Sequence, residues 1–85
     1  MKTLTVYSKD FCPYCIKAKK YLESLEIPYV EKNVGLDPEL REWLKARGHK
    51  TVPQIYMGDQ LFVAGGCDGL MKLTKEDILA KMNQQ

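Results

Sequence analysis

The sequence predicts an α/β fold in which helices cover both faces of a four-stranded mixed sheet. A strand-like, a helix-like and another strand-like segment follow one another in residues 3–34, and this order favours a parallel strand pair joined by a crossover helix. Two apolar runs, Val52–Met57 and Gln60–Ala64, are joined by Gly58-Asp59 and predict an antiparallel hairpin. Helical periodicity before and after this hairpin completes the predicted order β-α-β-α-β-β-α.

The first half of the chain is predicted to form a strand, a helix and a strand. Residues 3–7 alternate and are rich in strand-forming types. After Pro13, which suits a first helical turn, apolar positions recur at spacings of three and four, at Cys15, Ala18, Leu22 and Leu25. This pattern predicts an amphipathic helix over residues 13–26. The short segment 27–34 then predicts a second strand, with Pro28 at its entry.

The other two helices are predicted from their end signals. Asp37-Pro38-Glu39 combines an N-cap, a first-turn proline and an acidic residue, and the apolar pattern after it ends at Gly48. A helix of about ten residues follows from these signals. Gly65-Gly66 interrupts the chain before a final helix, which is expected to bend near Thr74, where Asp77 completes a cap for a second segment.

Length and composition predict one small domain over residues 1–85. Hydrophobic residues make up 45% of the chain and charged residues 28%, which is typical of a globular core. The longest apolar run, Leu61–Ala64, is far shorter than the roughly 18 residues of a membrane span, and no secretory signal precedes the first strand. We therefore expect a soluble, cytoplasmic monomer, and the formal charge of +2 gives no reason to expect a nucleic-acid partner.

Charge and cysteine content draw attention to the beginning of the chain. Residues 1–20 contain five lysines and one aspartate, a net charge of +4, whereas the other residues carry a net charge of −2. This positive excess surrounds Cys12 and Cys15. Three cysteines cannot pair into a closed disulfide framework, so the cysteines are expected to be catalytic, metal-binding or incidental.

Cys12-Pro13-Tyr14-Cys15 predicts a redox-active pair, because it places two sulfurs one turn apart where a helix follows a strand. At the exposed helix N-terminus, free N–H groups and the helix dipole should lower the pKa of the Cys12 thiol, with Lys9 adding to the effect. Cys12 is therefore the predicted nucleophile. Cys15 lies inside the first turn on the core-facing side, where it should stay protonated until it attacks a mixed disulfide on Cys12.

A zinc site is the main alternative for this pair. Zinc normally requires four ligands, and beyond the pair the chain offers only Cys67 and His49. No second C-x-x-C and no paired histidines accompany them. The spacing and the strand-to-helix context therefore favour redox chemistry over metal binding.

Three motifs together resemble those of a dithiol glutaredoxin, a family with the thioredoxin-like fold. They are Lys9 ahead of Cys12-Pro13-Tyr14-Cys15, the segment Thr51-Val52-Pro53-Gln54-Ile55, and Gly65-Gly66-Cys67-Asp68. The motifs occur in order and at suitable separations, and the resemblance covers nearly the whole chain. The combination is much more specific than any one motif.

The resemblance implies a cis peptide bond before Pro53, in a loop that faces the cysteines. Such a bond would leave the N–H and C=O of Val52 free to pair in strand fashion with the cysteine backbone of a bound thiol peptide. Without the family, a trans proline that opens an ordinary strand is the expected form.

The resemblance also implies glutathione as the bound peptide. Backbone N–H groups of the Gly66 turn can hold its γ-glutamyl carboxylate and Asp68 its ammonium group, although Asp68 also suits a plain N-cap role. The implied glutathione contacts are Lys9, Tyr14, Arg41, Thr51, Val52, Pro53, Gly66, Cys67 and Asp68. Lys9 and Arg41 would meet the glycine carboxylate and the Tyr14 ring would flank the thiol. Cys67 also has an alternative explanation as a buried, inert cysteine.

The implied activity is glutathione-dependent thiol–disulfide exchange without a permanently bound cofactor. Expected partners are glutathione, disulfide-bonded or glutathionylated proteins with ribonucleotide reductase among the candidates, and indirectly glutathione reductase with NADPH. One rival is a redoxin that a flavoprotein reductase reduces without glutathione. Another is a module in which two Cys12 thiolates and two glutathiones ligate a [2Fe–2S] cluster, although a competing Cys15 disfavours it.

Overall fold

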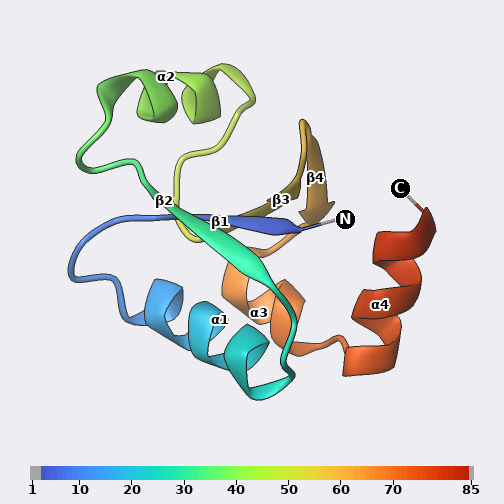
Figure 1. Cartoon of the computed structure of the whole chain (residues 1–85). Coiled ribbons are helices and arrows are strands. Elements are labelled where there is room, and N and C mark those ends of the chain that lie inside the picture. The colour runs from blue at the N-terminus through green and yellow to red at the C-terminus, as the bar shows by residue number, and fades with distance from the viewer. Residues whose placement is uncertain (1–2, 85) are drawn as a thin grey trace.

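The computed structural model describes residues 3–84 as four strands and four helices (Figure 1). In chain order these are β1 (Leu4–Ser8), α1 (Pro13–Ser24), β2 (Tyr29–Asn33), α2 (Pro38–Ala46), β3 (Gln54–Met57), β4 (Gln60–Val63), α3 (Gly66–Met71) and α4 (Lys75–Gln84). The expected domain over residues 1–85 includes Met1, Lys2 and Gln85, which lie outside the described residues. Among residues 3–84, no helix has both the length and the apolar character needed to cross a bilayer.

The sheet is mixed, as the sequence predicts, and its strand order is β2-β1-β3-β4. β1 pairs in parallel with β2 and antiparallel with β3, and β3 forms the predicted hairpin with β4. Helix α2 covers one face, whereas α1, α3 and α4 lie on the other (Figure 1). The parallel pair requires a crossover connection, which α1 supplies.

The last helix differs from the expected single bent element. Its chain folds as two helices, α3 and α4, because the helical hydrogen-bonding pattern stops after Met71 and begins again at Lys75. The predicted cap at Thr74 is present: the Asp77 N–H donates to Thr74 Oγ1, and the Thr74 N–H donates to Asp77 Oδ2, both at 3.1 Å. This reciprocal capping box satisfies two backbone donors at the new N-terminus and so starts a separate helix.

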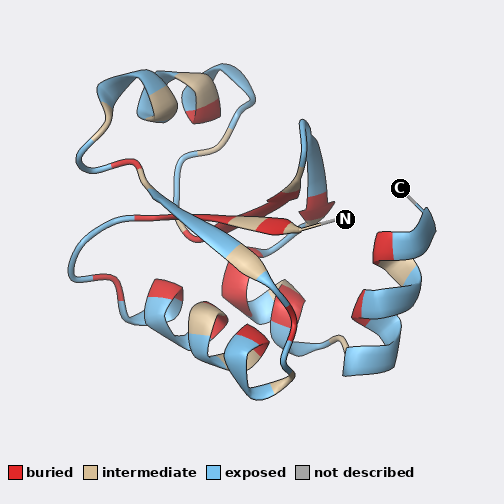
Figure 2. Ribbon diagram, in the orientation of Figure 1, coloured by how far each residue is buried: buried red, intermediate tan, exposed pale blue. Residues whose placement is uncertain are grey.

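Two apolar cores form, one on each face of the sheet (Figure 2). Alternation along β1 directs Val6 into the larger core under α1, α3 and α4, and Tyr7 into the smaller core under α2. In the smaller core the Trp43 ring centroid lies 5.4 Å from that of Tyr7 and 5.2 Å from that of Tyr56. These aromatic contacts hold α2 against its face of the sheet.

Helix α3 packs very closely on the end of β4. A Cβ atom added at Gly69 would lie 1.9 Å from the carbonyl oxygen of Ala64, a distance that no real side chain adopts. Glycine at this position therefore allows the helix backbone to approach the strand end directly. Since α3 also carries residues of the candidate site, this contact sets where that site lies.

Gly69→Ala is expected to lower the free energy of unfolding by about 1–3 kcal/mol, the usual cost of overpacking, even though alanine favours helix by up to about 1 kcal/mol. Urea unfolding followed by circular dichroism measures the difference. Asp68→Ala, on the exposed side of the same helix, serves as the control and should cost less than about 1 kcal/mol. Equal stability of Gly69→Ala and wild type would contradict the close approach.

Candidate active site

The two cysteines of the C-x-x-C motif form a disulfide at the beginning of α1. Cys12 is the N-cap residue, and the backbone N–H of Cys15 donates to its Sγ at 3.2 Å. After reduction, this N–H and the helix dipole would favour a negative charge on that sulfur. Contrary to the sequence prediction, Cys12 is not exposed, because only 6% of its surface is accessible to solvent. Cys15 is buried further, with 1% of its surface accessible.

Cys12 is buried because a loop from another part of the chain covers it. The antiparallel pairing of β1 with β3 sets Tyr7 opposite Gln54, so the segment before β3 lies beside the end of β1. In that segment the Val52–Pro53 peptide bond is cis, as the family resemblance implies. The carbonyl oxygen of Val52 lies 3.9 Å from Cys12 Sγ.

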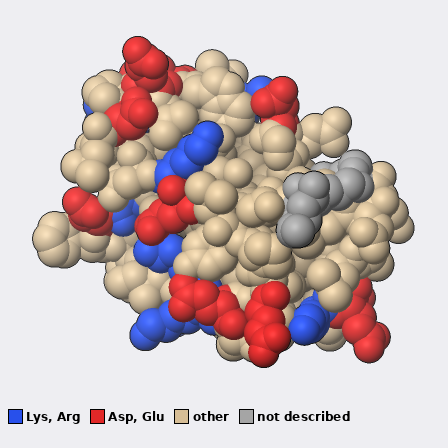
Figure 3. Space-filling model, viewed as in Figure 1, with Lys and Arg blue, Asp and Glu red and all other residues tan. Residues whose placement is uncertain are grey.

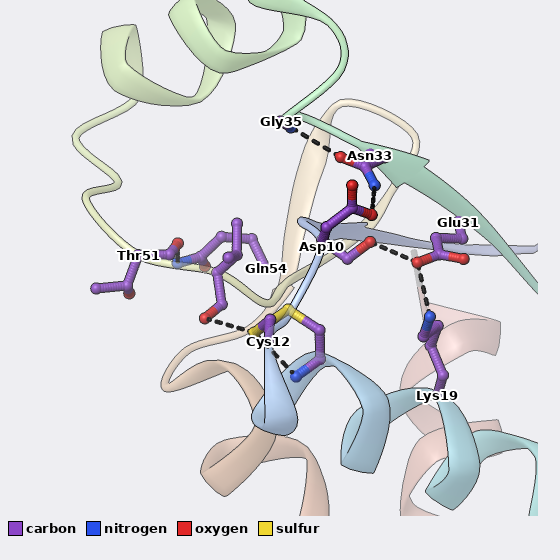
Figure 4. Close-up of a disulfide and its surroundings, with 11 residues drawn as sticks. Asp10, Cys12, Lys19, Glu31, Asn33, Gly35, Thr51 and Gln54 are labelled. Carbon is purple, nitrogen blue, oxygen red and sulfur yellow. Dashed lines mark hydrogen bonds and ion pairs between the residues drawn. A yellow bond between two sulfur atoms is a disulfide. The ribbon is translucent and has the colours of Figure 1, made fainter.

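A buried amide braces this loop from inside. The Gln54 side chain is 8% exposed, and its Nε2 donates to the carbonyl oxygen of Thr51 at 2.8 Å (Figure 4). Because the bond closes a short loop around Pro53, it fixes the direction of the Val52 backbone next to the disulfide. Sequence reasoning gave Gln54 no role, although an amide between Pro53 and the apolar run that follows is a sign of a buried polar contact.

The first turn of α3 lies against the same loop. A Cβ atom at Gly66 would lie 2.6 Å from the carbonyl oxygen of Pro53, and the Gly66 φ of +58° is also one that glycine adopts freely. Gly65 is the N-cap, and no side chain of the described residues caps this terminus. The N–H groups of the first turn, which have no partner within the helix, therefore lack a side-chain acceptor among the described residues.

A hollow of about 470 Å³ opens between this turn and the loop. Of the residues that the sequence proposes for the site, it brings together Tyr14, Thr51, Val52, Pro53, Gly66, Cys67 and Asp68. Tyr14 is 56% exposed, and Lys17 Nζ lies 5.4 Å from the centroid of its ring. These residues come from three segments far apart in the sequence and line one space next to the loop that approaches Cys12.

Lys9 and Arg41 lie at a second hollow, of about 510 Å³, rather than at the first. Val34 and Leu44 give it an apolar wall, and all its charged lining side chains among the described residues are cationic: Lys9, Arg41, Lys45 and Lys50. His49, Thr51 and Val52 line both hollows. The two spaces thus share a stretch of the loop that includes Val52, whose carbonyl oxygen lies 3.9 Å from Cys12 Sγ.

His49 is the main residue at this junction that the sequence did not indicate. Its Nε2 is 2.6 Å from the hydroxyl oxygen of Tyr56, on the strand that follows the loop. The contact orients the imidazole ring between the two hollows. No local pattern predicts it, because His49 and Tyr56 meet only when the loop folds back along β3.

Polar contacts fasten the loop that precedes Cys12 (Figure 4). Asn33, at the end of β2, donates to Asp10 at 2.9 Å. Beneath it, the buried hydroxyl of Ser8 donates to Glu31 Oε2 at 2.6 Å, and Lys19 Nζ approaches the same oxygen at 2.7 Å. The hydrogen bonds from Lys19 and Ser8 lower the pKa of the Glu31 carboxyl below its usual value.

The ion pair between Lys19 and Glu31 also offsets part of the net positive charge of residues 1–20. Glu31 compensates the charge of Lys19, one of the five lysines of residues 1–20. On the face drawn in Figure 3, acidic and basic side chains are interspersed. The cations that face a hollow near the disulfide are instead concentrated on and after α2.

Cys67 is a buried free cysteine beside the first hollow. It is 3% exposed, and its Sγ lies 3.6 Å from the sulfur of Met71, which can accept the thiol hydrogen. Burial raises the pKa of the Cys67 thiol, and the neighbouring Asp68 carboxylate raises it further. Within residues 3–84, no group of three or more His, Cys, Asp or Glu side chains is arranged to hold a metal ion.

Comparisons with known proteins agree with this geometry. The glutaredoxin family model matches residues 4–62. Glutaredoxin 1 from Rickettsia conorii is 42% identical over 85 residues, which cover 96% of this chain and 81% of that protein. Among solved structures, the buckwheat glutaredoxin–glutathione complex has a TM-score of 0.75 at 26% identity, over 98% of this chain and 78% of that one. The NrdH-redoxin of Escherichia coli, a glutaredoxin-like protein with a thioredoxin-like activity profile, has a TM-score of 0.70 at 26% identity, over 85% and 95%. These likenesses confirm the predicted thioredoxin-like fold.

In the reduced protein, Cys67 is expected to resist alkylation by iodoacetamide at pH 7 while Cys12 reacts. Only a thiolate is nucleophilic, and a pKa raised above the ordinary 9.0 leaves Cys67 protonated throughout the neutral range. Peptide mass spectrometry after timed quenching measures both sites, and the denatured protein is the control in which they should react alike. Modification of Cys67 at a rate similar to that of Cys12 in the folded protein would contradict this assignment.

Proposed function

The chain belongs to the glutaredoxin family and is a thiol–disulfide oxidoreductase, and from this premise we propose that glutathione is its co-substrate. The observation that carries the proposal is that Val52, whose carbonyl oxygen lies 3.9 Å from Cys12 Sγ, lines both hollows. A glutathione molecule whose sulfur lies at Cys12 has charged groups at both of its ends. Each hollow would bind one of these ends.

The second hollow suits the glycine carboxylate of glutathione. Lys9 and Arg41 both line it, and neither is accompanied there by an acidic side chain among the described residues. A carboxylate near two cations gains charge-assisted hydrogen bonds. The apolar wall would also lower the local dielectric and so strengthen them.

The first hollow suits the γ-glutamyl end. The uncapped first turn of α3 supplies backbone N–H groups for a carboxylate, and Asp68 supplies an acceptor for the ammonium group. Between the two ends, the N–H and C=O of Val52 would pair with the backbone of the glutathione cysteine. Glutathione would thus be recognised by main-chain groups of the protein at its cysteine, and largely by charged groups of the protein at its two ends.

Reduction of a protein disulfide would proceed by two exchanges. The Cys12 thiolate attacks one substrate sulfur, forms a mixed disulfide and releases a substrate thiolate, which takes up a proton. Cys15 then loses its proton, attacks Cys12 Sγ and closes the disulfide seen in the structure, which releases the second substrate thiol. Two glutathione molecules restore the dithiol and leave as glutathione disulfide. With a glutathionylated protein, a second glutathione can replace Cys15.

A thioredoxin-like reaction without glutathione is the second candidate, and the likeness to NrdH-redoxin favours it. The two are separated by coupling turnover of a glutathione mixed disulfide either to glutathione, glutathione reductase and NADPH, or to thioredoxin reductase and NADPH. Turnover only in the assay coupled to glutathione and glutathione reductase supports our proposal. Turnover only in the assay coupled to thioredoxin reductase would replace it with the second candidate.

Cys12→Ser is expected to abolish all activity, whereas Cys15→Ser should lose reduction of protein disulfides and keep removal of glutathione from mixed disulfides. Only Cys12 makes the first attack, and Cys15 is needed only when the enzyme must supply the second thiol. Rapid-quench mass spectrometry of the mixed-disulfide intermediate measures both steps. Asp59→Ala, at a position that lines neither hollow, serves as the control with full activity. Loss of deglutathionylation in Cys15→Ser would refute this division of roles.

Asp68→Ala is expected to raise the KM for glutathione about tenfold, because it removes one charge-assisted hydrogen bond worth roughly 1.5–3 kcal/mol before solvent screening. The alkylation rate of Cys12 by a small neutral reagent should not change, since Asp68 acts on the ligand and not on the sulfur. Asp59→Ala is the matched control, because Asp59 lies in the β3–β4 turn and lines neither hollow. An unchanged KM in folded Asp68→Ala would show that the γ-glutamyl end binds elsewhere.

A further inference from the structure

Two loops at one end of the sheet carry strongly exposed apolar side chains. Because β1 and β2 are parallel, the loops that follow them leave the sheet at the same end (Figure 1). The first loop carries Phe11, which is 98% exposed, and the second carries Leu36, which is 76% exposed. Among the described residues these are the two most exposed large hydrophobic side chains.

Folding alone does not account for phenylalanine at position 11. The ring makes almost no contact with the protein, and the backbone has a φ of +58°, a left-handed conformation that bulky side chains rarely adopt. The residue directly precedes Cys12. A large aromatic group is therefore held in solvent, one residue from the reactive sulfur, in a conformation that other residues would adopt more easily.

The two loops are fastened to each other. Asn33 donates to Asp10 at 2.9 Å and accepts from the Gly35 N–H at 2.8 Å, so one side chain bridges both loops (Figure 4). A Cβ at Gly35 would lie only 3.6 Å from the Lys9 Cβ. Phe11 and Leu36 are thus presented on one braced edge rather than on independent flexible segments.

This edge is separate from the space proposed for glutathione. Neither Phe11 nor Leu36 lines either of the two hollows. A small glutathione disulfide would therefore occupy the hollows without using these side chains. A folded or extended polypeptide with its disulfide at Cys12 is larger and would extend past Phe11.

We propose that Phe11 and Leu36 form a docking edge for protein substrates and select disulfides with an apolar residue beside the reactive cysteine. Exposed aromatic side chains that become buried on association typically dominate the affinity of an interface. Lys9, Asp10 and Asp37 give the edge the polar surroundings that such interfaces have. The proposal rests on thiol–disulfide exchange at Cys12 and does not require glutathione.

The test uses pre-reduced protein and two synthetic peptides of equal length, each with one internal disulfide. One peptide has leucine on both sides of a cysteine and the other has serine there. Each turnover oxidises Cys12 and Cys15 to their disulfide and reduces the peptide to two thiols, so two electrons and two protons are transferred without glutathione. Acid quenching and mass spectrometry give the second-order rate constant for each peptide.

Wild type is expected to reduce the leucine peptide about tenfold faster than the serine peptide, a difference of about 1.4 kcal/mol. The double variant Phe11→Ser, Leu36→Ser should lose this preference by slowing only with the leucine peptide, whereas Phe11→Tyr should retain it. Leu79→Ala, which removes an exposed leucine on α4, is the matched control and should behave as wild type.

Three results would overturn the proposal. Wild type without a preference, or without reaction toward either peptide, would exclude selection at this edge. An equal fall of both rate constants in the double variant would assign Phe11 to the nucleophile's own environment. Failure of glutathione as co-substrate would appear only in the coupled assay with glutathione reductase, and would leave the peptide preference unchanged.

Discussion

The placement of one sulfur between two backbone groups organises this protein. Cys12 Sγ accepts the Cys15 N–H at 3.2 Å and lies 3.9 Å from the Val52 carbonyl oxygen. The first group comes from the helix that begins at Cys12, and the second from the loop before β3. Because β1 is paired with β3, the strand that leads to the sulfur also holds that loop in place. Cys12 Sγ therefore keeps both contacts only when the β1–β3 pairing, the loop before β3 and the start of α1 are all in place.

Close backbone contacts with α3 also hold this loop in place. Gly66 lets α3 approach the Pro53 carbonyl, and Gly69 lets the same helix approach Ala64 at the end of β4. Neither position has room for a side chain. The relative positions of α3, the Pro53 loop and the end of β4, which border the first hollow, thus depend on close main-chain contacts.

Sequence reasoning recovered the parts of the fold that local chemistry determines. Asp37 caps α2 and Thr74 caps α4, as their spacing predicts, and the mixed sheet follows from the order of the elements. The redox pair Cys12 and Cys15 was predicted from their spacing and from their position where a helix follows a strand. The burial of Cys12 was not predicted, because the covering loop comes from 40 residues further along the chain.

The remaining features of the site depend on similar long-range packing. The cis bond at Pro53 was expected only from the family resemblance, since a single X-Pro pair favours the trans form. The position of His49 beside both hollows was not predicted, because its contact with Tyr56 requires the loop to fold back. The resemblance implied that Arg41 and Lys9 meet the other end of the ligand from Asp68, but the two hollows that hold these groups are visible only in three dimensions.

The division of the interior by the sheet also affects how unfolding would be observed. Trp43 is the single tryptophan of the chain and lies in the smaller core, against Tyr7 and Tyr56. Its fluorescence therefore reports the docking of α2, whereas far-ultraviolet circular dichroism is dominated by helices on both sides. Coincidence of these two signals in a denaturant titration is thus a direct measure of whether the two cores unfold as one cooperative unit.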